Sequence, residues 1–283
     1  MSAAYITTRR FNEATVTIIS NGTMVWTPHF PVAPEVARAA MPDAGPHGEL
    51  TLGLNVALVQ MGDAVVLIDP GCDDPGTAWD AHFAARFPPV VRSPGFAAAL
   101  TELGIQPDQV SHVPITHAHS DHYAGVVIDR GGRFDVRFPN ARHLIGRADW
   151  EGNPQHANAD SDFVQRLGAV DRAGLLDTVD DGHQIAPGIT ILGTPGETPG
   201  HLVVRVSSGG EHFYYLGDLI HHACEANNIG WVSHGDAEQA RVSRRRVFDE
   251  MAQAGGVSVT THDLFSPWRR IERSGGGYLT MPA

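Results

Sequence analysis

Short apolar runs, rich in β-branched residues and separated by polar or glycine-containing breaks, recur along the chain and predict buried strands. Near the start these runs cover residues 14–20 (ATVTIIS), 54–60 (LNVALVQ) and 64–69 (AVVLID). The last two are separated only by the segment MGD, which predicts a hairpin turn. Residues 110–115 (VSHVPI) form another short apolar run. The N-terminal part of the chain therefore predicts a sheet.

The C-terminal part repeats this strand pattern, and helices are predicted between the strand blocks. Strands are expected at 189–193, 202–207, 212–217 and 257–260. Helices are expected at 77–86, at 95–104, and from a capping box of Asp236 and Gln239 to about residue 251 or 254. The stretch before residue 189 is expected to mix helix and loop, and the tail after 260 carries no predicted element.

This alternation of strands and helices predicts one α/β domain over residues 1–283. Its N-terminal half covers about 14–170 and its C-terminal half about 180–283, and helices bury the outer faces of the sheets. A hydrophobic content of 42% is ordinary for a soluble protein, and no apolar run approaches the about 18 residues of a membrane span. The first residues lack the apolar segment and cleavage site of a secretory signal, so a cytoplasmic location and no membrane association are expected. Cys72 and Cys224 fit no CxxC pattern and are expected to be buried free thiols.

Charge excludes several classes of function. The net charge of −12 argues against a nucleic-acid partner, because phosphates are neutralised by a positive surface. All 20 basic side chains are arginines, and there is no lysine. A Schiff-base lysine, a phosphate-loop lysine and a Ser-Lys dyad are therefore excluded, and no GxSxG or SxxK motif indicates a serine hydrolase.

The segment ITHAHSDHYAG, residues 115–125, concentrates metal-binding side chains at the end of a predicted strand. His117, His119, Asp121 and His122 lie within six positions. Grouped imidazoles and a carboxylate are costly to bury alone, but they suit Zn²⁺ and similar divalent ions. Four ligands exceed the three that one open catalytic zinc site takes from the protein, so two metal ions are expected.

Three later residues are further candidate ligands, because each lies beside a predicted strand end. They are His201 in TPGETPGHLVV, Asp218 in FYYLGDLIHH and His262 in VSVTTHDLF. Together with Asp69 in VVLIDPG and the 117–122 cluster, these motifs resemble, in their order, those of the metallo-β-lactamase fold superfamily. The resemblance covers about residues 14–283. It implies an αββα sandwich with the metal site at the edge of the two sheets.

The resemblance also implies a role for each motif residue. The first ion would be held by His117, His119 and His201, and the second by Asp121, His122 and His262. Asp218 would bridge both ions, with a hydroxide between them as the nucleophile, and Asp121 or Asp218 would relay a proton. Asp69 would orient ligands without binding metal. Nitrogen and oxygen ligands of this kind favour zinc, with manganese, iron and cobalt as alternatives.

Single positions indicate the branch of the superfamily. β-Lactamases generally carry Cys or Ser at the position of Asp218, and flavodiiron enzymes carry Glu at the position of His119. The segments VTIISNGT, FPNARHLIGRADW and THDLFSPWRRIERSGGGYLTMP are similar to those of methyl parathion hydrolase and the related lactonases and arylesterases. This similarity implies hydrolysis of a lactone or aryl ester, phosphotriesterase side activity and a homodimer.

A mostly apolar pocket for a small neutral, hydrophobic ester or lactone is expected beside the metals. The candidate aromatic lining residues are Trp26, Phe30, Trp150, Phe265 and Trp268, each of which could instead pack in the core. His221 and His222 could contact the leaving group or could form a solvated loop.

Three alternative functions remain open at this point. One is a thioesterase similar to glyoxalase II, which would need basic residues to bind the carboxylates of glutathione. Another is a mononuclear iron dioxygenase acting on persulfides, and the third is a non-catalytic binding protein. Metal content separates them, because two zinc-like ions indicate the hydrolase and one iron indicates the oxygenase.

Overall fold

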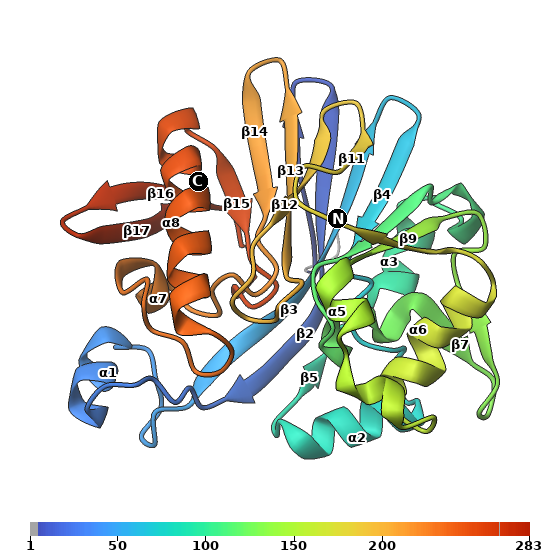
Figure 1. Ribbon diagram of the computed structural model, residues 1–283, viewed down its shortest axis with the longest axis horizontal. Helices are drawn as coiled ribbons and strands as arrows, with labels where there is room; N and C mark the ends of the chain where they lie inside the picture. The colour runs from blue at the N-terminus through green and yellow to red at the C-terminus, as the bar shows by residue number, and fades with distance from the viewer. Residues whose placement is uncertain (1–4, 266) are drawn as a thin grey trace.

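The computed structural model describes residues 5–265 and 267–283 and contains two β-sheets packed face to face (Figure 1). The N-terminal sheet consists of β1 (Ile6–Phe11), β2 (Ala14–Trp26), β3 (Leu50–Met61), β4 (Ala64–Ile68), β5 (Val91–Arg92), β6 (His112–Ile115), β9 (Arg142–Gly146) and β10 (Leu176–Val179). Its strand order is β1-β2-β3-β4-β6-β9-β10, and β5 pairs with β2.

The C-terminal sheet follows the order of the chain. It consists of β11 (Gln184–Ala186), β12 (Ile189–Gly193), β13 (Leu202–Ser208), β14 (Glu211–Tyr215), β15 (Val257–Val259), β16 (Arg269–Ser274) and β17 (Gly277–Pro282). A separate hairpin pairs β7 (Val127–Asp129) with β8 (Phe134–Val136).

Helices cover the outer faces of both sheets. The described α-helices are α1 (Pro34–Ala40), α2 (Ala78–Arg86), α3 (Phe96–Glu102), α4 (Ser120–Tyr123), α5 (Arg147–Glu151), α6 (Asp162–Arg172), α7 (Ala223–Asn227) and α8 (Ala237–Ala254). Figure 1 shows α3, α5 and α6 beside the N-terminal sheet and α7 and α8 beside the C-terminal sheet. The predicted αββα sandwich is confirmed.

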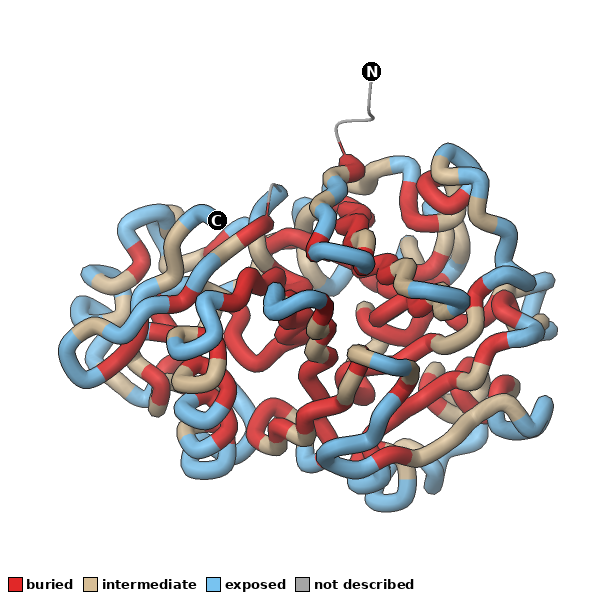
Figure 2. The backbone as a smooth tube through the Cα atoms, turned by 90° about the horizontal axis from the view of Figure 1, so that it is seen from above, coloured by how far each residue is buried: buried red, intermediate tan, exposed pale blue. Residues whose placement is uncertain are grey.

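Strand periodicity explains how one chain fills three apolar layers. In β13, Val204 and Val206 belong to the core between the sheets, whereas Val203 belongs to the core under α8. In β2, Ile18 faces the other sheet and Ile19 packs toward the α3 and α6 side. Successive side chains of a strand point to opposite faces, so both faces must be apolar when both are covered. Figure 2 shows the buried backbone concentrated in the interior of both halves.

The predicted strands and helices are present with small shifts at their ends, and several further elements appear. The MGD segment forms a tight turn at Gly62 and Asp63, where Gly62 has a φ of 56°. β2 runs on to Trp26, past an irregularity between Ser20 and Thr23. The tail forms the β16–β17 hairpin, which was not predicted. The middle stretch, expected to mix helix and loop, contains α6 and also the strands β9 and β10, which were not predicted.

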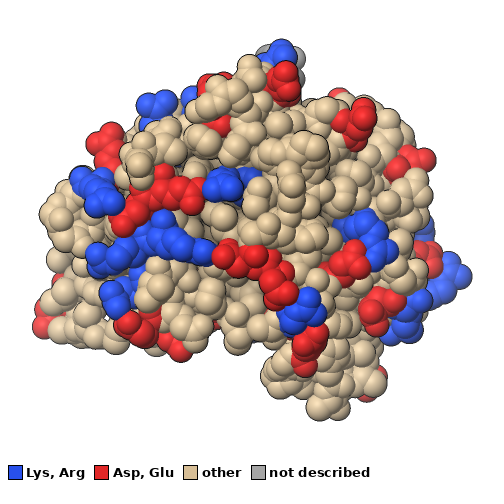
Figure 3. All heavy atoms as spheres, turned by 45° about the horizontal axis from the view of Figure 1, so that its top comes forward, with Lys and Arg blue, Asp and Glu red and all other residues tan. Residues whose placement is uncertain are grey.

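None of the described helices combines the length and apolar character needed to cross a membrane. On the face shown in Figure 3, arginine and acidic side chains are interspersed. Cys72 and Cys224 are buried free cysteines, as expected, and burial raises the pKa of each thiol to about 12.

Candidate active site

The candidate ligands meet at one edge of the sandwich because of the strand directions. β4 runs parallel to β6, and β14 runs parallel to β15, so the carboxyl ends of each pair lie at the same edge. Asp69 follows β4, His117 lies just beyond β6, Asp218 lies beyond β14 and His262 lies beyond β15. His201 immediately precedes β13, and the amide of Leu202 donates to the carbonyl of Thr116 at 2.8 Å. This hydrogen bond joins the two halves at the site.

Gly217, directly before Asp218, allows this close approach. Its φ is 54°, in the region that favours glycine. A Cβ atom here would lie 2.7 Å from Thr116 Oγ1 and 3.0 Å from His201 Nε2. A side chain at this position would therefore push two candidate-ligand segments apart.

The donor atoms converge closely. His117 Nε2 lies 2.8 Å from His119 Nδ1, and Asp218 Oδ2 lies 3.1 Å from His262 Nε2 and 3.3 Å from His122 Nε2. Asp121 lies beside the last two, with its Oδ2 atom 3.7 Å from His122 Nε2 and 3.8 Å from His262 Nε2. His201 lies beside this centre, with its ring 5.2 Å from that of His117, but it belongs to none of the groups of possible metal ligands found among the described residues.

These spacings fit bound divalent ions. Ligands at 2.0–2.2 Å from one ion lie about 2.8 to 3.6 Å from each other, which is the spacing of the closest pairs here. Two buried atoms at the centre, His122 Nε2 and Asp218 Oδ1, have no hydrogen-bond partner among the described residues. Buried polar atoms are normally paired, and coordination of a divalent cation would satisfy both of these atoms.

Hydrogen bonds on the far side of three histidine rings direct their Nε2 atoms toward the centre. His122 Nδ1 lies 2.8 Å from Asp69 Oδ2, His262 Nδ1 lies 2.9 Å from the Gly53 carbonyl, and His201 Nδ1 lies 2.8 Å from Thr194 Oγ1. For His122 and His262, a proton on Nδ1 satisfies an acceptor and leaves the Nε2 lone pair toward the centre. The Nε2 atom of His201 differs, because it accepts a hydrogen bond from the Asp218 amide at 3.2 Å.

Charge is distributed unevenly in this cluster. Burial lowers the pKa of His117 well below its usual value and lowers that of His201 to about 4, so both rings are neutral at pH 7. Burial alone would also lower the pKa of His122, but the carboxylates of Asp218, Asp121 and Asp69 raise it well above its usual value. Burial would raise the pKa of Asp218, but His122, His262 and His221 hold it well below its usual range.

Asp69 and Asp149 hold the segments that carry candidate ligands. Asp69 is fully buried and accepts from the amide and hydroxyl of Thr116, both at 2.7 Å. Asp149, which the sequence did not indicate, accepts from the amide of Ala118 at 3.0 Å and from that of Gly200 at 2.6 Å. It thereby joins the 117–119 segment to the turn before His201. An aspartate in a short helix gives no sequence signal for this role.

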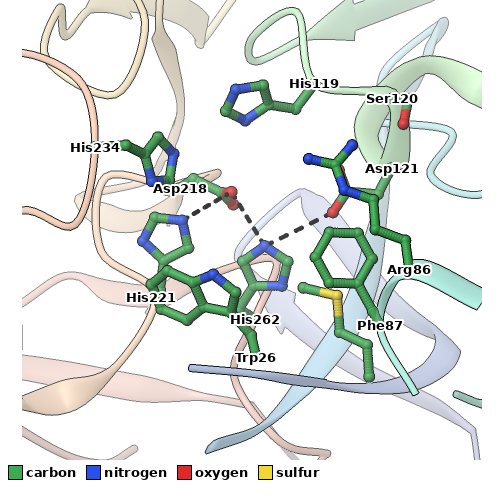
Figure 4. A pocket seen from close by; sticks show the side chains of 11 residues that line it. Trp26, Arg86, Phe87, His119, Ser120, Asp121, Asp218, His221, His234 and His262 are labelled. Atoms are coloured by element: carbon green, nitrogen blue, oxygen red, sulfur yellow. Dashed lines mark hydrogen bonds and ion pairs between the residues drawn. The ribbon is translucent and has the colours of Figure 1, made fainter. Parts of the chain in front are cut away.

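A pocket of about 290 Å³ opens onto the candidate ligands (Figure 4). Met24, Trp26 and Phe87 form its apolar wall. The rest of the lining is polar or charged and consists of His119, Asp121, Asp218 and His262 together with Arg86, Ser120, His221 and His234. The pocket is more polar than expected, because the candidate ligands make up much of its surface.

Of the five candidate aromatic residues, the structure brings Trp26 to the pocket and puts the others elsewhere. Phe30 packs on Trp231 with ring centroids 5.3 Å apart, and Trp150 packs on Phe163 at 5.3 Å. Trp268 lies in the core between the sheets, and Phe265 is 37% exposed and outside the pocket lining. Packing in the core thus accounts for three of them.

His221 and His222 point in different directions. His221 is buried, stacks on Trp26 with ring centroids 4.8 Å apart, and brings Nε2 to 3.3 Å from Asp218 Oδ2. His222 lies outside the lining of this pocket, where its Nδ1 atom accepts from the Cys224 amide at 3.2 Å and begins α7. The sequence alone did not distinguish the two histidines, because their different environments depend on the path of the loop and not on their residue type.

Glu197 and His234 join the site without having been predicted. Glu197 Oε1 lies 3.5 Å from His119 Nδ1 and 3.7 Å from His221 Nε2, and it pairs with His234 Nε2. Glu197 belongs to one group of possible metal ligands with His117, His119 and Asp218, whose donor atoms all lie within 4.8 Å of one another. Its position four residues before His201 in TPGETPGH is the only sequence signal.

Comparison with known sequences gives a family match. A sequence model described as the metallo-beta-lactamase superfamily matches residues 51–250. The N-acyl homoserine lactonase AttM of Azorhizobium caulinodans is 29% identical over 217 residues, which cover 72% of this chain and 77% of the relative. A probable metallo-hydrolase of Mycobacterium tuberculosis is 26% identical over 223 residues, which cover 72% of this chain and 69% of the relative.

Solved structures share the fold over the whole chain. A structure described as hydrolase AbOPH in the beta lactamase superfamily has a TM-score of 0.80 at 21% identity and covers 100% of this chain and 99% of its own. The structure of AidC, described as a dizinc quorum-quenching lactonase in complex with a product, has a TM-score of 0.78 at 19% identity, with coverage of 98% and 97%. At these identities the likeness is one of fold.

Proposed function

This chain belongs to the metallo-β-lactamase superfamily and is a metal-dependent hydrolase, and from that premise we propose that it hydrolyses lactones or aryl esters with two divalent ions. The observation that carries the proposal is the converging set of buried histidines and carboxylates around His122 Nε2 and Asp218 Oδ1, two atoms without hydrogen-bond partners among the described residues. Zinc is the proposed metal, because imidazole nitrogens dominate the set.

The proposed ligands divide between the two ions. His117, His119 and His201 would hold the first ion, and Asp121, His122 and His262 would hold the second, with Asp218 between them. When bound, such ions lower the pKa of a water molecule and polarise the carbonyl oxygen that is attacked. Asp69 and Asp149 would act as positioning residues, because Asp69 accepts hydrogen bonds from the amide and hydroxyl of Thr116 and Asp149 accepts one each from the amides of Ala118 and Gly200.

A carboxylate must also receive the proton that the attacking water releases. Both side chains line the pocket, but that of Asp121 is 13% exposed whereas that of Asp218 is 3% exposed. Asp121 is therefore the better placed of the two to pass a proton to solvent. His221, with Nε2 directed at Asp218, would contact the departing oxygen from the same side.

A small neutral substrate suits this pocket. The wall of Met24, Trp26 and Phe87 offers apolar surface next to the ligands, which matches an acyl chain or an aryl group. Relatives of the chain are named N-acyl homoserine lactonases, which supports a lactone as the first substrate to test. Phosphotriester hydrolysis is proposed as a side activity of the same centre.

A substrate panel with metal removal and return tests the proposal. Purified protein is assayed with N-hexanoyl-homoserine lactone, phenyl acetate, paraoxon and S-lactoylglutathione, before chelation, after chelation and after return of Zn²⁺ or Mn²⁺. We expect hydrolysis of the lactone or the aryl ester to disappear on chelation and to return with about two ions per chain. Hydrolysis that persists after complete metal removal would rule out the proposed mechanism.

The same panel separates the alternatives. A much faster reaction with S-lactoylglutathione would instead indicate the thioesterase. Arg86 is the only arginine in the described lining of the pocket, so the structure offers few basic side chains for the carboxylates of glutathione. One iron per chain with oxygen uptake would indicate the persulfide dioxygenase.

A further inference from the structure

Glu197 lies in the first of two consecutive Thr-Pro-Gly turns. Residues 194–201 read TPGETPGH, so Glu197 and His201 occupy equivalent positions, each directly after a TPG sequence. His201 is one of the proposed ligands of the first ion. The side chain of Glu197 is 4% exposed and faces the same centre. The repeated turn therefore directs two ligand-type side chains into one site.

The surroundings of Glu197 do not include a permanent cation. Its ion-pair partners among the described residues are His119, His221 and His234, and no arginine pairs with it there. Burial of a carboxylate is costly unless the group is paired or coordinates a metal. By contrast, the buried Glu225 nearby is paired with Arg244. Glu197 thus resembles Asp218, whose ion-pair partners in the described part of the chain are likewise all histidines of the centre.

The spacing fits coordination of the first ion. Glu197 Oε1 lies 3.5 Å from His119 Nδ1, and His119 Nδ1 lies 2.8 Å from His117 Nε2. Both values fall in the range of about 2.8 to 3.6 Å expected between ligands that share an ion. Resting on the two-ion function proposed above, we propose that Glu197 supplies a carboxylate oxygen to the first ion and is held toward it by His234.

This assignment changes the metal preference expected for the first site. Three histidines with the one shared carboxylate of Asp218 favour zinc, whereas a second carboxylate also suits Mn²⁺ and other ions that prefer oxygen ligands. Removal of the charge of Glu197 should therefore weaken Mn²⁺ binding more than Zn²⁺ binding. We expect a loss of at least about tenfold in Mn²⁺ affinity, the scale of losses seen even for groups just outside a metal's ligand set.

Cobalt provides a direct readout, because its visible spectrum depends on the number and type of ligands. We would titrate metal-free Asp121→Ala, in which only the first site should fill, and compare it with the same variant that also carries Glu197→Gln. The control is Asp121→Ala with Glu250→Gln, since Glu250 pairs with Arg205 and lies outside the site. We expect Glu197→Gln alone to alter the cobalt spectrum and to weaken Mn²⁺ binding at least tenfold.

The outcomes separate this inference from the proposed function. If Asp121→Ala binds no ion, or keeps two, the two-site assignment fails, and the inference about Glu197, which rests on it, is overturned with it. If Asp121→Ala binds one ion and Glu197→Gln leaves the cobalt spectrum and Mn²⁺ affinity unchanged, Glu197 is not a ligand, and the inference is overturned while the hydrolase proposal stands. Unaltered far-UV circular dichroism would establish that each variant is folded.

A measurement on the unmodified chain covers the case in which Glu197→Gln does not fold. In crystals of the manganese-loaded protein, anomalous scattering locates the first ion directly. A Glu197 oxygen within about 2.2 Å of that ion supports the inference. A separation of more than about 3 Å, with His234 as the sole partner of Glu197, overturns it.

Discussion

Two buried clusters of this protein carry charge: the candidate ligand cluster at the sheet edge, and the pair of Arg244 and Glu225 behind it. Only in the second do the charged groups find their partners within the protein. Arg244 on α8 donates to the carbonyl of Leu219 at 2.7 Å and to that of Trp231 at 2.5 Å, and it pairs with Glu225. In the ligand cluster, His122 Nε2 and Asp218 Oδ1 have no hydrogen-bond partner among the described residues. The Arg244–Glu225 pair therefore satisfies its charges within the protein, whereas the ligand cluster keeps two polar atoms that a bound ligand would satisfy.

The two clusters are connected through the chain. Leu219 directly follows Asp218, and the Glu225 carboxylate accepts from the amides of His221 and His222 at 3.0 and 3.2 Å. Burial would raise the pKa of Glu225, but Arg244 and the His221 side chain lower it to about 2, so the carboxylate stays ionised. The Arg244–Glu225 pair thus fixes the loop after Asp218, which carries part of the ligand cluster. This difference predicts opposite responses to substitution.

The largest effect is expected on activity, from Asp121→Ala. Loss of this carboxylate should empty the second site, reduce the metal content from about two ions to one, and lower kcat/KM by about a thousandfold or more, or about 4 kcal/mol. Stability of the metal-free protein should change little, because no arginine among the described residues pairs with Asp121. Metal analysis, ester assays and urea unfolding check these points. Asp63→Ala, in the exposed turn between β3 and β4, is the control. Two retained ions with full turnover would contradict the assignment.

Arg244→Met should have the reverse profile. Glu225 would remain buried without its cation, which costs about 3 to 5 kcal/mol of unfolding free energy. Urea unfolding of metal-free protein measures this loss. The double variant Arg244→Met with Glu225→Leu should recover part of it, because neither charge is then left alone. A loss of unfolding free energy below about 1 kcal/mol for Arg244→Met would mean that pairing with Arg244 does not stabilise the buried Glu225 carboxylate.

The sequence predicted the candidate ligands better than their surroundings. His117, His122, Asp218 and His262 could be identified because they combine metal-binding chemistry with strand ends that share one edge. Whether they bind metal as assigned stays a prediction. Glu197 could not be identified, because a glutamate in a turn is normally a surface residue. Its burial depends on how the two sheets meet.

Pocket residues were harder to predict, because aromatic residues pack in the core as readily as they line a site. Trp268 was a candidate on the basis of its closeness to His262 in sequence, but the unpredicted β16–β17 hairpin carries it into the core between the sheets. Trp26 reaches the pocket because β2 continues beyond its irregularity. His221 and His222 separate because the Glu225 contacts fix the path of their loop.

A smaller effect on metal binding is expected from Asp149→Asn. Asp149 joins the backbone at Ala118 to that at Gly200, so it supports the ligand cluster from outside. An amide cannot accept all of these hydrogen bonds as strongly, and metal affinity should fall by about 10 to 100-fold. Competition with a chromogenic chelator measures this change. Exposed Asp160→Asn serves as the control, and equal affinities of the two variants would assign Asp149 a purely structural role.

The smallest effect separates burial from charge pairing and concerns His143, a fully buried histidine on β9 outside both clusters. Burial lowers its pKa from 6.5 to about 4, and the backbone carbonyls of Leu175 and Ala141 offset only part of this shift. Between these values the unfolded chain takes up a proton that the folded protein does not, so stability is lost as pH falls below about 6.5. At pH 5 the loss amounts to about 2 kcal/mol relative to pH 7.

His143→Leu should remove this part of the pH dependence, whereas the same change at exposed His183 should not. Urea unfolding of the three metal-free proteins at pH 7 and pH 5 provides the measurement. If His143→Leu lost as much unfolding free energy as the wild type between pH 7 and pH 5, protonation of buried His143 would not be the cause of that loss. The prediction that burial of an unpaired histidine lowers stability at acidic pH would then be wrong.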